Sequence, residues 1–119
     1  MEDKIFTLKN CGTCQRILKE VGVDDSMDVQ NVKEKNISAK ELDYLKKKVG
    51  SYEELFNKRA MKYRSQELNK RDDISEKEWR SLILGEYTFL KRPVAVVGDE
   101  VFVGNTQKVV AALKEKLNG

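Results

Sequence analysis

Cys11-Gly12-Thr13-Cys14, which comes shortly after the apolar run Ile5-Phe6-Thr7-Leu8, is the stretch of sequence that decides the fold. It holds the only two cysteines of the chain. A helical pattern follows, with Ile17, Leu18 and Val21 on one side. A strand, a CxxC motif and a helix in this order are what a dithiol redox site requires. The sequence therefore predicts thiol chemistry where a strand meets a helix.

The two cysteines are predicted to have different roles. A helix N-terminus offers unpaired N–H groups and a partial positive charge, which lower the pKa of a thiol placed there. Cys11 is therefore the candidate nucleophile. Cys14, one turn into the helix, is the candidate resolving thiol, which attacks a mixed disulfide formed at Cys11. The alternative is that two cysteines lie close in the sequence by chance.

Composition narrows the class of protein. The 119 residues fit one domain, with 39% hydrophobic and 36% charged residues. A net charge of +3 gives no basic stripe, so we expect no direct nucleic-acid partner.

No signal peptide and no membrane-spanning run is visible, so we expect a cytoplasmic protein without a membrane partner. Thiols are kept reduced in the cytoplasm, which favours a redox or metal-binding CxxC over a structural disulfide.

The absence of histidine argues against a metal site. A structural zinc ion usually has four cysteine or histidine ligands, and this chain offers two cysteines and no histidine. Zinc would need a dimer that shares two CxxC pairs. We expect no metal and no bound cofactor.

Apolar alternation marks strands at both ends of the chain. The first strand is expected at about residues 4–8, and a helix that starts near Thr13 should stop at Gly22. Residues 26–32 could form a second strand. Residues 94–97 and 100–103, separated by Gly98-Asp99, have the pattern of a β-hairpin. Asn105 is the expected N-cap of the last helix.

The middle of the chain has a helical pattern. Capping boxes begin at Ser38, Ser51 and Ser75, and each precedes apolar residues at helical spacing. The second should open a helix through Leu55 and Phe56, and the third a helix that reaches Tyr87. The predicted fold class is α/β, with a thioredoxin-like order β-α-β … β-β-α and a mixed sheet. Residues 1–119 form a single domain in this prediction, and roughly residues 37–90 are a helical insertion within it.

Pro93, the only proline, directly precedes the predicted strand at residues 94–97. Proline is accepted at the first residue of a strand, and in cis it marks a tight turn. A thioredoxin-like fold has a cis-proline facing the CxxC, so Arg92 would lie near the cysteines and could stabilise a thiolate or an oxyanion. The alternatives are an ordinary proline at a strand start and a solvated basic pair, Lys91-Arg92.

The combined pattern resembles the ArsC/Spx family over essentially the whole chain. The matching motifs are Cys11-Gly12-Thr13-Cys14-Gln15-Arg16, Phe89-Leu90-Lys91-Arg92-Pro93 and Val101-Phe102-Val103-Gly104-Asn105, around an all-helical middle. The resemblance implies that Cys11 is the catalytic cysteine and that Arg92 and Arg59 hold an oxyanion. The third arginine of the family's reductases falls where this chain has Gly104. These reductases also have serine at the position of Cys14.

Two functions follow from the resemblance. The first is an arsenate reductase-like thiol oxidoreductase that reduces arsenate or a protein or glutathione disulfide. Glutathione, glutaredoxin or thioredoxin would be its reductant and partner. Cys11, Cys14 and Arg92 would be catalytic, and Arg59 and Pro93 would bind substrate. The alternative is an Spx-type regulator that senses redox state through its dithiol and binds RNA polymerase. Cys14 and Gly104 are similar to the Spx type.

Overall fold

The chain divides into two units in the computed structural model, which describes all of residues 1–119. The first, which we call the sheet unit, consists of Met1–Lys35 and Arg92–Gly119. The second, the helical unit, consists of Asn36–Lys91. The four strands and both cysteines belong to the sheet unit.

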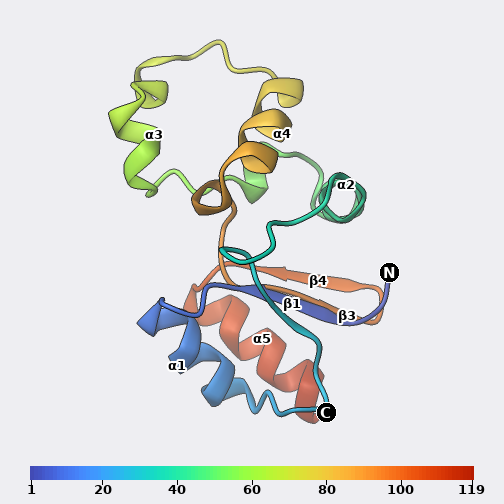
Figure 1. Ribbon diagram of the computed structural model, residues 1–119. Helices are drawn as coiled ribbons and strands as arrows, with labels where there is room; N and C mark the ends of the chain where they lie inside the picture. Colours follow the sequence, from blue (N-terminus) through green and yellow to red (C-terminus); the bar gives the residue numbers. More distant parts are fainter. The chain divides into compact units, whose positions relative to one another are not determined.

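The sheet is mixed, as the sequence predicts. Its strands are β1 (Lys4–Thr7), β2 (Val29–Asn31), β3 (Val94–Val97) and β4 (Glu100–Val103). Their order is β2-β1-β3-β4; β1 and β2 are parallel, whereas β1–β3 and β3–β4 are antiparallel. Helices α1 (Gly12–Val21) and α5 (Gln107–Asn118) lie side by side against the sheet (Figure 1). The predicted α/β fold class is confirmed.

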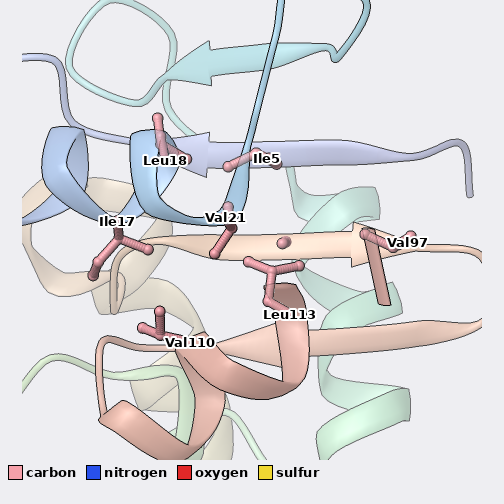
Figure 2. Packing of buried hydrophobic residues seen from close by; sticks show 8 residues of the cluster. Ile5, Ile17, Leu18, Val21, Val97, Val110 and Leu113 are labelled. Carbon is pink, nitrogen blue, oxygen red and sulfur yellow. The ribbon is translucent and has the colours of Figure 1, made fainter. Parts of the chain in front are cut away.

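The core of the sheet unit lies between the sheet and these two helices. Ile5 of β1 and Ala95 of β3 face the helices because alternate residues of a strand point to the same side. Figure 2 shows the apolar side chains that meet them. Those from the helices are Ile17, Leu18, Val21, Val110 and Leu113. Burying this stripe fixes α1 against β1, and with it the position of the first turn of α1.

The ends of the elements in this unit agree with the predictions at most places. Gly22 ends α1 with φ 85°, a left-handed conformation that glycine adopts without a Cβ clash. The second strand is shorter than the predicted residues 26–32. The predicted N-cap Asn105 is wrong, because Thr106 caps α5: its hydroxyl accepts the N–H of Val109 at 3.3 Å.

The helical unit contains three α-helices and three short 3₁₀ turns. They are α2 (Ala39–Val49), η1 (Glu53–Leu55), α3 (Met61–Ser65), η2 (Leu68–Lys70), α4 (Glu76–Gly85) and η3 (Tyr87–Phe89). The aromatic rings of Phe56, Trp79 and Phe89 pack together, with centroids 4.6 Å (Phe56–Trp79) and 4.8 Å (Phe56–Phe89) apart. These aromatic side chains form a core, and so they do not offer an exposed stacking surface.

Two predictions for this unit need correction. Ser51 accepts the N–H of Glu54, but the turn that follows is 3₁₀ and ends at Leu55, so no α-helix forms there. Helix α4 ends at Gly85, before Tyr87, because Glu86 leaves the helical conformation. The Glu86 carboxylate instead accepts the N–H of Thr88 at 3.1 Å. No helix of the chain has the length and apolar character needed to cross a membrane.

Ser38 should be a stabilising cap. The Ser38 hydroxyl accepts the N–H of Glu41 at 3.1 Å, and the Glu41 carboxylate accepts the N–H of Ser38 at 3.0 Å. We expect Ser38→Ala to lower the free energy of unfolding by about 1 kcal/mol in urea titrations. Ser81→Ala, at an exposed position inside α4, is the matched control and should leave stability unchanged or raise it slightly, because alanine favours a helix more than serine does. Equal losses in the two variants would contradict the role of the cap.

Candidate active site

Cys11 occupies the N-cap of α1, directly after the turn that leaves β1. Its backbone is extended, with φ −96° and ψ 110°, and its N–H donates to the carbonyl of Leu8 at 3.1 Å. Its carbonyl accepts the N–H of Gln15 at 3.0 Å and so closes the first turn of the helix. The sulfur then lies where a capping oxygen usually lies, and it accepts the N–H of Cys14 at 3.5 Å. The side chain is partly exposed.

These surroundings favour the thiolate of Cys11. Burial opposes the charged form, but hydrogen bonds from the backbone and the thiol of Cys14 outweigh it. The positive charge of Arg92 and the N–H of Thr13 act in the same direction, and together they hold the pKa of Cys11 below its usual value. Cys11 is therefore a partly exposed thiol that ionises easily, which is what a nucleophile requires.

Cys14 has the opposite character. Only 1% of its surface is exposed. Burial raises the pKa of Cys14, and its hydrogen bond to Cys11 raises it further. Cys11 therefore ionises at a lower pH than Cys14. Both cysteines are free, so the structure is that of the reduced dithiol.

Arg92 and Pro93 directly precede β3, and the charge of Arg92 acts on Cys11. The Arg92–Pro93 peptide bond is cis. Pro93 is buried, and it lies two residues before Ala95, so it is on the sheet face that α1 covers. The carbonyl of Pro93 accepts the N–H of Gly104 at 2.9 Å. Gly104 has φ 94°, a conformation that disfavours any residue with a Cβ.

The remaining predicted residue, Arg59, belongs to the other unit. Cys11, Cys14, Arg92 and Pro93 all belong to the sheet unit, whereas Arg59 is exposed in the helical unit. It follows η1, and its N–H donates to the side chain of Asn57 at 3.1 Å. A part for Arg59 in holding substrate remains a prediction.

Thr7 is a further polar residue at this site, and no motif in the sequence marks it. It is the last residue of β1 and is 2% exposed. Its hydroxyl acts on Cys14 and favours the thiolate there. The signal in the sequence was one hydroxyl residue within the apolar run Ile5-Phe6-Thr7-Leu8, four positions before Cys11.

The arrangement suits dithiol exchange. A partly exposed thiol with a lowered pKa is next to a buried thiol with a raised pKa, and a guanidinium favours the thiolate of the first. Such a pair can attack a substrate with the first sulfur and release the product with the second. No group of three or more histidine, cysteine, aspartate or glutamate side chains is arranged to hold a metal ion.

Comparison with known proteins gives a consistent result. The model of the ArsC family matches residues 6–113. An arsenate reductase-related protein from Brucella melitensis is 26% identical, with a TM-score of 0.69 over 94% of this chain and 93% of that one. A Staphylococcus aureus protein is 28% identical, with a TM-score of 0.72 and coverages of 93% and 97%. An arsenate reductase from Vibrio cholerae shares the fold at 17% identity, with a TM-score of 0.76 and coverages of 95% and 98%. Among curated proteins, no sequence matches the chain.

Arg92→Ala should raise the pKa of Cys11, because it removes a positive charge that favours the thiolate. In a Cys14→Ala background, the alkylation rate of Cys11 should rise with pH through a midpoint below the value of about 8.5 for a free cysteine. Arg92→Ala should move this midpoint to higher pH. At pH values well below the midpoint, each unit of that shift lowers the fraction of thiolate about tenfold.

Lys91→Ala is the matched control and should leave the midpoint in place. If Lys91→Ala moves it and Arg92→Ala does not, the wrong member of the basic pair has been assigned to the site. A midpoint at or above the free-cysteine value in the parent protein would refute the activation of Cys11.

Proposed function

The chain belongs to the ArsC family, and from this membership and the unlike thiols of its CxxC motif we propose that it is a dithiol oxidoreductase. Cys11 is the nucleophile and Cys14 resolves the intermediate. The observation that carries the proposal is the contrast between the lowered pKa of Cys11 and the raised pKa of Cys14. Two thiols with equal pKa values would not be distinguished as a nucleophile and a resolving thiol.

The proposed reaction transfers two electrons from the dithiol to a disulfide. The Cys11 thiolate attacks one substrate sulfur, the substrate S–S bond breaks, and the first product leaves as a thiolate. Cys14 then attacks the sulfur of Cys11, which releases the second product and leaves a Cys11–Cys14 disulfide. Glutathione, glutaredoxin or thioredoxin returns the two electrons. The cycle fits a cytoplasmic protein, because such reductants keep thiols reduced in the cytoplasm.

A disulfide suits this site better than arsenate does. A tetrahedral oxyanion needs several positive or N–H donors, and Arg92 is the cation that acts on Cys11 within the sheet unit. Gly104 stands where the family resemblance places another arginine, and its N–H is already bound to the carbonyl of Pro93. A disulfide is uncharged at the reacting atoms, so a nucleophile and one cation suffice. Arsenate is the second substrate to test.

The test is turnover of a glutathione mixed disulfide and, separately, of arsenate, each with glutathione and glutaredoxin or with thioredoxin as reductant. We expect the disulfide to be reduced faster than arsenate. Cys11→Ser should reduce turnover to the uncatalysed rate, since it removes the nucleophile. With a Cys14→Ser variant, the dithiol route should stop at the mixed disulfide on Cys11. Full turnover in Cys11→Ser would overturn the proposal.

The alternative function is an Spx-type regulator, which Cys14 and Gly104 favour through the family resemblance. The reduced and oxidised proteins should then bind RNA polymerase with different affinity in a pull-down, and neither disulfide nor arsenate should turn over. Binding that depends on redox state, together with the absence of turnover, would replace the oxidoreductase proposal with this one.

Mild oxidation should close an intramolecular disulfide. The thiol of Cys14 is already hydrogen-bonded to Cys11, so little movement should be needed to join the two sulfurs. After treatment with peroxide, the mass of the intact chain should fall by two hydrogen atoms, and alkylating reagents should no longer modify it. Cys14→Ser should instead gain oxygen at Cys11. A parent protein that accumulates sulfenic acid or a disulfide-linked dimer would contradict the role of Cys14.

A further inference from the structure

Thr7 carries a buried hydroxyl that nothing in the packing of the sheet unit requires. It is 2% exposed, and its Oγ1 completes no hydrogen bond in the reduced protein. A buried hydroxyl without a partner costs stability, so valine would serve packing alone at least as well. The hydroxyl is close enough to Cys14 to favour the thiolate there. The unpaired hydroxyl and its proximity to Cys14 together indicate that the hydroxyl gains a hydrogen-bond partner when Cys14 loses its proton.

Strand and helix geometry place Thr7 and Cys14 together independently of any titration. Thr7 is two residues after Ile5, so both point to the face that α1 covers. Ile5 packs against the stripe of α1 that includes Leu18 (Figure 2). Cys14 precedes Leu18 by four residues, one helical turn, and so continues the same buried stripe toward the end of β1.

The sheet register adds a second constraint. Phe6 pairs with Val94 across the antiparallel β1–β3 ladder, so Thr7 is opposite Pro93. Proline has no N–H to offer to a neighbour. The Thr7 hydroxyl therefore lies between the first turn of α1 and Pro93, the residue before β3, which supplies no backbone donor.

We propose that Thr7 is a positioning residue for the resolving step: its hydroxyl donates a hydrogen bond to the sulfur of Cys14 as that sulfur becomes the attacking thiolate. This inference rests on the proposed dithiol function. Cys14 needs such help because the chain has no histidine and burial disfavours its charged form. The other titratable group that acts on Cys14 is Cys11, and it opposes ionisation. Besides Thr7, the backbone of Leu8 is the group that favours the Cys14 thiolate.

In the resolving step, which Thr7 assists, one S–S bond forms and another breaks. Cys14 loses its proton to solvent or to the leaving thiolate, and its sulfur forms a bond to the sulfur of Cys11. The bond between Cys11 and the bound substrate half breaks, and that half departs with the electron pair as a thiolate. The same hydrogen bond stabilises Cys14 when a reductant later opens the Cys11–Cys14 disulfide, because Cys14 is then the leaving group.

A chromogenic disulfide, dithiobis-nitrobenzoate, tests the inference without a natural substrate. The first coloured thiolate released reports the attack by Cys11. The second, released in a step that does not depend on reagent concentration, reports the attack by Cys14. Cys14→Ser should abolish the second release. Stopped-flow absorbance separates the two phases in the parent protein, in Thr7→Val and Thr7→Ala, which lack the hydroxyl, and in Thr7→Ser, which keeps it.

We expect Thr7→Val and Thr7→Ala to slow the second phase and to leave the first unchanged, and Thr7→Ser to restore the second phase. Each unit by which the pKa of Cys14 rises lowers its thiolate fraction about tenfold. The thiolate that remains is about threefold more nucleophilic, so the second phase should slow about threefold per unit. Thiolate absorbance against pH, in a Cys11→Ser background, should show a higher pKa for Cys14 in Thr7→Val. The stability of reduced Thr7→Val should equal or exceed that of the parent protein.

Two results would overturn the inference. One is a second phase at the parental rate in Thr7→Val and Thr7→Ala. The other is a second phase in Thr7→Ser as slow as in Thr7→Val, which would assign the effect to packing. Failure of the proposed dithiol function would give another result in the same assay, because the parent protein itself would then release only one coloured thiolate per chain.

Discussion

The contact between β1 and α1 is the constraint on which the rest of this site depends. Ile5 holds the strand against Leu18 and Val21, and this packing fixes where the first turn of the helix begins. Unpaired N–H groups at that turn need an acceptor, and the sulfur of Cys11 is the acceptor that the sequence supplies. The same geometry that completes the helix therefore polarises the thiol. Structure and reactivity have one cause here, since the cap and the nucleophile are the same atom.

The chemistry follows from placing two identical side chains in unlike surroundings. Cys14 follows Cys11 by three positions, about one helical turn, which is enough to leave Cys11 partly exposed and to bury Cys14. Arg92, brought to the site by β3, acts on the exposed thiol. The Thr7 hydroxyl acts on the buried thiol. In a chain without histidine, these contacts take the place of a general base.

The sequence allowed most of the fold to be predicted, because local signals agreed with the global arrangement. The hairpin around Gly98-Asp99 and the cap at Ser38 lie where their patterns indicated. Predictions failed where a neighbouring group competed: Thr106 caps α5 in place of Asn105, and Glu86 ends α4 before Tyr87. Thr7 was missed because the register that places it opposite Pro93 joins residues far apart in the chain. The role of Arg59 rests on family resemblance alone, because Arg59 belongs to the helical unit.

Direct titration of both cysteines in one protein tests the central claim that their surroundings make them unlike. The chain can be labelled with ¹³C at the cysteine Cβ atoms and followed by NMR as pH rises, with Cys11→Ser and Cys14→Ser used to assign the two signals. The account predicts that the Cys11 signal moves first, with a midpoint below that of a free cysteine, and that the Cys14 signal moves only at distinctly higher pH. Coincident midpoints, or a Cys14 signal that moves first, would contradict it.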